Sequence, residues 1–345
     1  MKIIVASTIV PFIYGGGTSI VDWLVLKLNE YGHQAESIKL PYSSDINQMM
    51  SQTVGLRMFH LEDYCERLIP IRMPSYQLQH PEKYLWFIHH YREVYDLWDT
   101  EFSPFPHTEK NCAIREYVMR SDDVSLREAK KIFTNSQVVS NRLTKFNALD
   151  STVVYPPIFD ISSFRCNSYG DYIYYSSRIC SHKRQLLAVQ AMKYTKTPVK
   201  LVITGKSERP QDAEEIYYEI KYNHLEDRVT VIDRWISDEE KAKFLSDCLA
   251  AIYIPYDEDS YGYPSLEAHH SQKAVISCKD SGGTDELIVD GYNGYLTDPT
   301  PQALASVYDE MYLDKNKTET MGRNGLKRID ELQINWDNVV RRFTE

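Results

Sequence analysis

The chain has 345 residues, 43% hydrophobic and 26% charged, which is enough for two α/β domains of ordinary size. Its formal charge of −10 argues against a nucleic-acid-binding protein, and no polybasic run marks an anchor on an anionic membrane. No apolar run reaches the roughly 18 residues that cross a bilayer. The six cysteines lack C-x-x-C spacing, which is typical of a reduced cytoplasmic protein.

The first half alternates strand and helix patterns from residue 2 onward. Strands are predicted at 2–8 and 33–40, with a helix at 19–32 between them, and this βαβ order predicts a parallel sheet. The segment 42–81 has an irregular helical pattern rich in aromatic residues and methionine, and we interpret it as an insert that packs on the core or faces a substrate. Further strands are predicted at 84–90, 130–136 and 151–156.

The second half repeats the alternation more regularly. Pro156, Pro157 and the polar segment that follows predict a linker over 156–171. Strands are then predicted at 171–177, 199–205, 228–233, 250–256 and 274–278, with helices at 183–194, 213–224, 238–248 and 265–272. The pattern predicts two Rossmann-like, doubly wound domains, at 1–155 and 172–334.

The most informative segment is 252–276, where a buried strand leads into an acidic turn, a glycine and a helix with Pro264 in its first turn. The free N–H groups of such a helix attract phosphate, and Gly262 has no Cβ to keep a ligand away. Asp259 and Glu267 stand eight positions apart and could bracket a phosphate or bind sugar hydroxyls. The alternative is an ordinary strand-to-helix connection with solvated carboxylates.

The segment D-S-Y-G-Y-P-S-L-E-A at 259–268 resembles the Glu-x7-Glu motif of the retaining glycosyltransferases of family four. The resemblance implies the GT-B architecture: two Rossmann-like domains that face a cleft, and a C-terminal helix, here 335–345, that returns to the first domain. It also implies that Glu267 holds the ribose of a nucleotide. The first acidic position falls on Asp259, one methylene shorter than glutamate, with Glu258 as the alternative.

The resemblance extends to several other segments of the second domain. The turn residues Tyr261, Gly262 and Tyr263 are implied to face the transferred sugar and the pyrophosphate. The segment R-W-I-S-D-E-E resembles the loop beside the nucleotide base, which makes Trp235 and Ile236 candidates for nucleoside binding; a surface turn is the alternative.

A basic loop follows the first strand of the second domain. Arg178 and Lys183 stand five apart there, and two cations could balance a diphosphate. The family writes this loop as G-R-x-x-x-x-K-G, and the chain has Ser177 and Arg184 where the glycines are usual.

Two features of the first domain also resemble the family. Gly15, Gly16 and Gly17 lie between the first strand and the first helix, where the family has a glycine-rich loop near the donor phosphate, so Gly16 and Gly17 are candidates for donor binding. The family places a histidine against the transferred sugar, and we assign this role to His89 rather than His90.

The triplet Asp257-Glu258-Asp259 also fits the D-x-D metal site of the other large glycosyltransferase architecture. That site belongs to a single-domain fold, and a cation pair already offsets the diphosphate here. We therefore expect no metal and no cofactor.

The resemblance thus implies a retaining glycosyltransferase with a front-face mechanism, in polysaccharide, lipopolysaccharide or other glycoconjugate biosynthesis, and the cation pair predicts that it is metal-independent. Its expected partners are a UDP- or GDP-sugar and a glycan, lipid-linked or small-molecule acceptor, without nucleic acid. A cytoplasmic location is expected, with weak peripheral association at the inner membrane face left open. The alternatives are a nucleotide-sugar epimerase and a non-catalytic nucleotide-sugar-binding relative; an oxidoreductase is disfavoured because G-x-G-x-x-G is missing.

Overall fold

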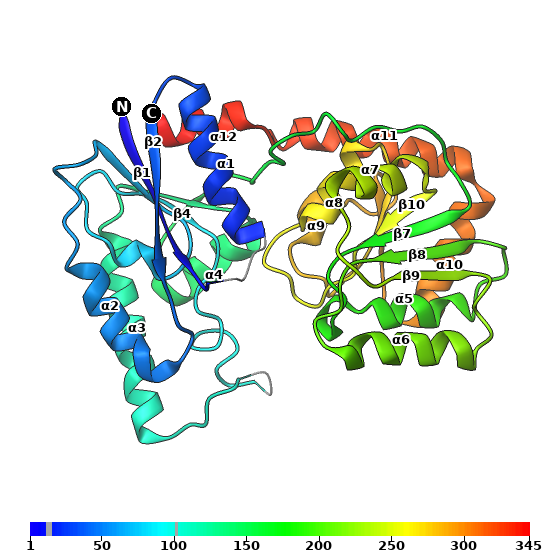
Figure 1. The fold of residues 1–345 in the computed structure, drawn as a ribbon, viewed down its shortest axis with the longest axis horizontal. Helices are drawn as coiled ribbons and strands as arrows, with labels where there is room; N and C mark the ends of the chain where they lie inside the picture. Colours follow the sequence, from blue (N-terminus) through cyan, green and yellow to red (C-terminus); the bar gives the residue numbers. More distant parts are fainter. Residues whose placement is uncertain (12–15, 101–102) are drawn as a thin grey trace. The chain divides into compact units, whose positions relative to one another are not determined.

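The computed structural model describes residues 1–11, 16–100 and 103–345 (Figure 1). The contacts within the chain divide it into two compact units. Unit 1 comprises Met1–Pro157 and Asn335–Glu345, and unit 2 comprises Ile158–Ile334.

Unit 1 contains two short parallel sheets that adjoin each other. Its elements are β1 (Lys2–Ile9), α1 (Gly16–Glu30), β2 (Gln34–Pro41), η1 (Ile46–Gln48), α2 (Met49–Arg57), β3 (Arg67–Pro70), η2 (Ser75–Gln77), β4 (Tyr84–Phe87), α3 (Glu109–Arg127), β5 (Lys131–Thr134), α4 (Gln137–Asn147), β6 (Thr152–Val153) and α12 (Trp336–Thr344). The strand orders are β2-β1-β3 and β4-β5-β6, and a parallel bridge between Leu68 and Lys83 joins β3 to β4. Helices cover both faces, because α1 and α12 contribute to one apolar cluster while α3 and α4 contribute to another.

The C-terminal helix belongs to unit 1, as the resemblance implied. Trp336, Val339, Val340 and Phe343 are buried in the apolar cluster that also contains residues of α1 and β1. The Phe343 ring lies 5.1 Å from that of Trp86 and 4.8 Å from that of Phe133, measured between ring centroids.

Several predictions for unit 1 were wrong in detail. The segment 42–81 contributes β3 to the sheet, so it is not simply an insert. The predicted strand 84–90 ends at Phe87, and that at 151–156 shrinks to Thr152–Val153. The 19-residue helix α3 was not predicted at all.

Unit 2 is built on a single six-stranded parallel sheet. Its elements are β7 (Tyr172–Ser176), η3 (Ser181–Lys183), α5 (Gln185–Met192), β8 (Lys200–Thr204), α6 (Pro210–Tyr222), β9 (Val229–Ile232), α7 (Asp238–Asp247), β10 (Ala250–Ile252), α8 (Tyr263–His270), β11 (Val275–Cys278), α9 (Thr284–Leu287), β12 (Gly294–Thr297), α10 (Pro301–Leu313) and α11 (Lys315–Glu331). The strand order is β12-β11-β10-β7-β8-β9.

This order makes unit 2 a doubly wound sheet, as predicted. Residues of α5, α6 and α10 form one apolar cluster with the sheet, and residues of α7 and α8 form another. The order reverses between β7 and β10, which are hydrogen-bonded neighbours although about 80 residues separate them in the chain. Doubly wound sheets bind ligands at the carboxyl ends of the strands at such a point.

Candidate active site

The loops that follow β7 and β10 contact each other at the reversal point of the unit 2 sheet. The backbone N–H of Tyr256 donates to the carbonyl of His182 at 2.8 Å. The two loops carry Arg178 and Lys183 on one side and Glu258, Asp259 and Gly262 on the other. Residues that the sequence analysis assigned to one anion site therefore do lie on neighbouring loops.

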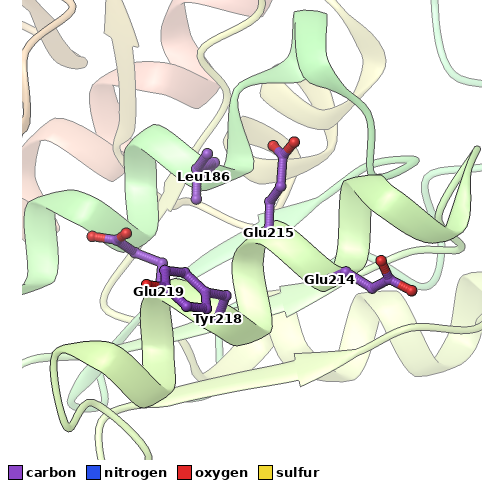
Figure 2. A pocket seen from close by; sticks show the side chains of 5 residues that line it. All are labelled: Leu186, Glu214, Glu215, Tyr218 and Glu219. Atoms are coloured by element: carbon purple, nitrogen blue, oxygen red, sulfur yellow. The ribbon is translucent and has the colours of Figure 1, made fainter.

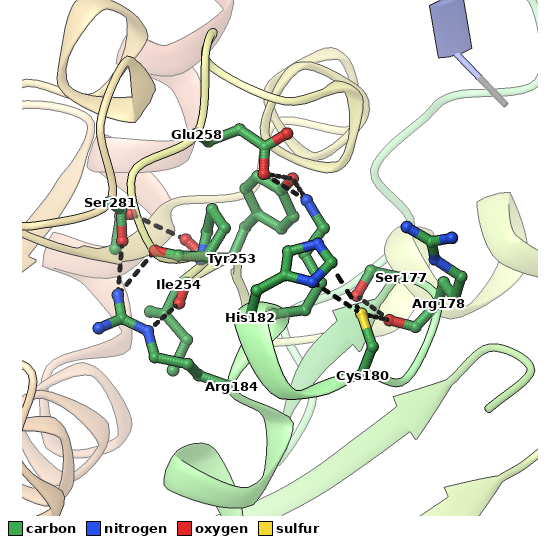
Figure 3. A network of polar contacts seen from close by, with 12 residues as sticks. Ser177, Arg178, Cys180, His182, Arg184, Tyr253, Ile254, Glu258 and Ser281 are labelled. Atoms are coloured by element: carbon green, nitrogen blue, oxygen red, sulfur yellow. Dashed lines mark hydrogen bonds and ion pairs between the residues drawn. The ribbon is translucent and has the colours of Figure 1, made fainter. Parts of the chain in front are cut away.

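Lys183 is the centre of this contact. Its Nζ donates to the hydroxyl of Tyr253 at 2.7 Å and to the carboxylate of Glu258, and its side chain is 12% exposed (Figure 3). Arg178 is more exposed and less tightly paired, because its side chain is 56% exposed and lies 3.6 Å from the carboxylate of Glu208. The loop thus carries a hydrogen-bonded, largely buried cation on Lys183 and an exposed cation on Arg178.

The acidic turn presents Glu258 to Lys183. The hydroxyl of Tyr253 also donates to Glu258 at 3.2 Å, and the Glu258 carbonyl accepts from the N–H of Gly283 at 2.9 Å. Asp259 is the next residue along the turn and is half-buried. Both acidic residues therefore lie at the site, and the assignment of the first acidic position stays a prediction.

Gly262 immediately precedes α8, and a residue with a side chain there would be strained and would collide with the Tyr253 ring. Its φ is +72°, and a Cβ there would lie 2.2 Å from the Tyr253 ring. This close approach brings the beginning of α8 against the same tyrosine that Lys183 contacts. Tyr261 is buried beside it, and Tyr263 is half-buried, with burial raising the pKa of its hydroxyl.

Glu267 lies one turn inside α8 and is ion-paired. Its Oε1 accepts from Nζ of Lys241 in α7 at 2.5 Å, and the two side chains are 10% and 18% exposed. Burial raises the pKa of Glu267, and the positive charge of Lys241 opposes this rise. The sequence analysis did not identify Lys241, because nothing in its local pattern distinguishes it from a solvated lysine of an acidic helix turn.

The predicted base loop lies between β9 and α7. Trp235 is 83% exposed, and Ile236 is half-buried. Arg234 pairs with Glu240 at 2.6 Å and donates to the carbonyl of Trp235 at 3.0 Å, which restrains the loop backbone. An exposed indole on a restrained loop is suited to stack on a planar ligand.

In unit 1 the two histidines after β4 have different surroundings. His90 is buried, its Nε2 lies 2.8 Å from Oδ1 of Asn147, and burial lowers its pKa to about 4. His89 is half-buried, and its Nδ1–H donates to the carbonyl of His90 at 2.7 Å. This tautomer leaves Nε2 of His89 as the acceptor, so His89 is the better suited of the two to meet a ligand.

The glycine-rich segment begins outside the described residues, because Gly15 falls in the gap. Gly16 is the first residue of α1, and a Cβ on Gly17 would lie 3.6 Å from Nε of Arg72. Arg72 in turn donates to the carbonyl of Thr8 at 3.2 Å, so an arginine stands at the carboxyl end of β1. Sequence reasoning missed Arg72.

A hollow of about 350 Å³ lies elsewhere in unit 2, between side chains of α5 and α6 (Figure 2). It is lined by Leu186, Glu214, Glu215, Tyr218 and Glu219. None of the predicted site residues lines it, and its carboxylates would repel a nucleotide. It is not the predicted donor site.

Within residues 1–11, 16–100 and 103–345, no group of three His, Cys, Asp or Glu side chains could hold a metal ion. In the same part of the chain, no helix is long and apolar enough to span a bilayer.

Comparison with known proteins gives the site a family context. Residues 161–328 match the family described as glycosyl transferases group 1. The chain is 33% identical over 128 residues to alpha-1,3/1,6-mannosyltransferase ALG2 of Dictyostelium discoideum, covering 37% of this chain and 30% of that protein. It is 32% identical over 131 residues to ALG2 of Mus musculus, covering 37% and 31%. The matches thus span less than a third of these curated relatives.

Solved structures extend the likeness to nearly the whole chain. Sucrose-phosphate synthase from Thermosynechococcus elongatus superposes with a TM-score of 0.77 at 18% identity, over 98% of this chain and 96% of that one. Anabaena HepE, solved in complex with UDP, superposes with a TM-score of 0.71 at 16% identity, over 99% and 98%. Residues 161–328 therefore form a domain of the glycosyl transferases group 1 family, within a chain that has the GT-B fold.

Proposed function

We propose that this protein is a retaining glycosyltransferase that moves a sugar from a nucleotide diphosphate sugar to an acceptor hydroxyl. The observation that carries the proposal is the cluster of Lys183, Tyr253 and Gly262 at the reversal point of the unit 2 sheet. It brings the ammonium of Lys183 to the beginning of α8, where the positive end of the helix dipole favours a phosphate. The family match over residues 161–328 supports the same reading.

In the proposed reaction the bond between the sugar's anomeric carbon and the β-phosphate oxygen breaks, and a bond to the acceptor oxygen forms on the same face. The acceptor's proton passes to an oxygen of the departing diphosphate. Lys183, Arg178 and the backbone amides near Gly262 would stabilise the negative charge that develops on this diphosphate. No side-chain nucleophile and no metal ion are needed in this scheme.

The remaining site residues take binding roles in the proposal. Glu267 orients the ribose, Trp235 and Ile236 contact the base, and Tyr261 and Tyr263 flank the turn at the sugar. The proposal keeps His89 as the histidine for the transferred sugar, and Gly16 and Gly17 as candidates for donor binding.

The donor is proposed to be a UDP- or GDP-sugar. UDP and UDP-glucose are named in the HepE structures, and the ALG2 relatives are named mannosyltransferases, so glucosyl and mannosyl donors are the first to test. The acceptor is a glycan, a lipid-linked sugar or a small molecule. A lipid-linked acceptor would bring the protein to the cytoplasmic face of a membrane, which flotation with anionic vesicles would test.

The first experiment is thermal unfolding with UDP, GDP, ADP, dTDP and NAD in turn. A ligand that binds only the native state adds about 2.7 kcal/mol at 100 times its dissociation constant. We expect one nucleoside diphosphate to stabilise the wild type and to stabilise Lys183→Ala much less. Lys279→Ala is the matched control, because that lysine makes only an exposed ion pair with Asp298.

Stabilisation by NAD alone would contradict the proposal, as would equal responses of Lys183→Ala and the wild type. Turnover then separates the remaining classes. With the nucleotide sugar in deuterated water and no acceptor, an epimerase incorporates deuterium at a sugar carbon and a transferase does not. A non-catalytic relative would bind the donor and release no nucleoside diphosphate with any acceptor.

A further inference from the structure

We propose that Arg184 is a positioning residue of the donor site, which ties together the three loops that follow β7, β10 and β11. The inference rests on the proposed function, because those loops carry the residues assigned to the diphosphate. It concerns a side chain that no catalytic or binding role has been given above.

Hydrogen-bond acceptors surround the guanidinium of Arg184, and Figure 3 shows those of Ile254 and Ser281. Its Nε donates to the carbonyl of Ile254 at 2.7 Å, and its Nη2 donates to the carbonyl of Pro255 at 2.7 Å. The two Nη atoms also form a bidentate pair with Asp280, both at 2.8 Å, and Nη2 lies 3.1 Å from the hydroxyl of Ser281. The fork geometry of arginine suits this arrangement, and lysine could not reproduce it.

These contacts make Arg184 unsuited to bind phosphate itself. Its side chain is 16% exposed, and its nitrogen atoms already face two backbone carbonyls, a carboxylate and a hydroxyl. A phosphate would have to displace Asp280. Arg184 therefore acts through the residues that it holds.

The backbone of Arg184 gives a second reason to assign it a role. Its φ of +59° and ψ of +34° lie in the left-handed region, where glycine is favoured over residues that carry a Cβ. The residue ends η3 and directly precedes α5, so the chain must turn there. Because this backbone conformation favours glycine, the arginine found there indicates that the hydrogen bonds of its guanidinium offset the backbone strain.

Each loop that Arg184 ties leads to a part of the donor site. Lys183 is its neighbour in the chain. The carbonyls of Ile254 and Pro255 begin the loop that carries Glu258, and Asp280 begins the turn whose backbone pairs with Glu258. Arg184 thus fixes the loop that carries Lys183 relative to the loop that carries Glu258, the carboxylate partner of Lys183.

The test uses Arg184→Gly, which keeps the left-handed turn while it removes the guanidinium. With whichever of UDP or GDP binds the wild type, we expect at least a tenfold loss of affinity in calorimetry at 15 °C. We expect the matching monophosphate to lose less than threefold, because the loops hold the diphosphate end of the ligand. Asp280→Asn should act in the same direction more weakly, Arg184→Lys should not restore binding, and Lys279→Ala should match the wild type.

A purely structural role predicts different results. It would lower the unfolding temperature of Arg184→Gly and leave both affinities unchanged, or lower both affinities equally, and either result would overturn the proposal. A measurement without ligand distinguishes failure of the role proposed for Arg184 from failure of the proposed function. Hydrogen exchange should speed up in residues 254–262 and 279–284 of Arg184→Gly and not in Lys279→Ala, whether or not any nucleotide binds; unchanged exchange would also overturn the inference.

Discussion

Lys241 and Glu267 form a partly buried ion pair that joins α7 to α8, with Nζ and Oε1 2.5 Å apart. Lys241 also contacts Asp238 at 3.0 Å, but the Asp238 side chain is 84% exposed. Glu267 is therefore both the expected ribose ligand and the main partner of a buried cation. Its two roles can be separated by experiment.

Glu267→Gln should destabilise unit 2 by about 3 kcal/mol, because it leaves the ammonium of Lys241 without its buried partner. The double variant Glu267→Gln with Lys241→Met should recover most of this stability and should not recover nucleoside diphosphate binding. Urea unfolding and calorimetry measure the two quantities. If the double variant binds like the wild type, Glu267 has only a structural role.

Glu258→Gln should raise the affinity for the nucleoside diphosphate about threefold, or roughly 0.6 kcal/mol, and should lower turnover. The carboxylate of Glu258 contacts the ammonium of Lys183, so it would compete with the proposed ligand for this cation and would repel a diphosphate. Calorimetry and initial rates check the two effects. Asp298→Asn, which alters the exposed partner of Lys279 away from the assigned site residues, is the matched control, and an affinity loss in Glu258→Gln would contradict the prediction.

His269→Gln should make the free energy of unfolding depend less on pH between pH 7 and pH 5. His269 is buried, its Nδ1–H donates to the carbonyl of Lys273 at 3.1 Å, and burial lowers its pKa to about 4. Because the unfolded chain takes up a proton near pH 6.5 and the native chain does not, this histidine stabilises unit 2 above that pH. The contribution is lost as the pH falls, by about 2 kcal/mol between pH 7 and pH 5.

Denaturant unfolding at pH 7 and pH 5 measures this loss. The variant should be less stable than the wild type at pH 7 and should lose about 2 kcal/mol less between the two pH values. His224→Gln changes an exposed histidine and should keep the wild-type slope. Equal slopes for His269→Gln and the wild type would refute the assignment.

Phe343→Ala should cost unit 1 about 3–5 kcal/mol, because it empties a fully buried site between Trp86 and Phe133. Urea unfolding followed by circular dichroism measures the loss. Arg341→Ala changes an exposed residue of the same helix and should have little effect. A loss below about 1 kcal/mol would mean that α12 contributes little to unit 1.

Trp235→Ala should weaken nucleotide binding about fivefold, or roughly 1 kcal/mol, by removing a surface on which the base can stack. The unfolding temperature should change little, because the side chain is 83% exposed. Tyr222→Ala removes another exposed aromatic ring, 67% exposed, and should leave binding intact. Unchanged affinity in Trp235→Ala would remove it from the base site.

Much of the fold was predictable because its signals are local. The alternation of β-branched strands with amphipathic helices indicated two doubly wound sheets, and the family resemblance implied the C-terminal helix. The failures have local causes as well. β3 is four residues long and buried throughout, so it shows no alternation, and the buried face of α3 includes Asn111 and Asp122, which interrupt its apolar stripe.

Sequence by itself determined which residue types stand at the reversal point of unit 2: a basic loop after one strand, and an acidic turn, a glycine and a helix after another. Only the tertiary structure decided which of them meet. The pairing of Lys183 with Glu258, of Glu267 with Lys241, and of Arg184 with Asp280 joins residues 75, 26 and 96 positions apart. Such pairs depend on the order of strands in the sheet, and no local pattern in the chain encodes that order.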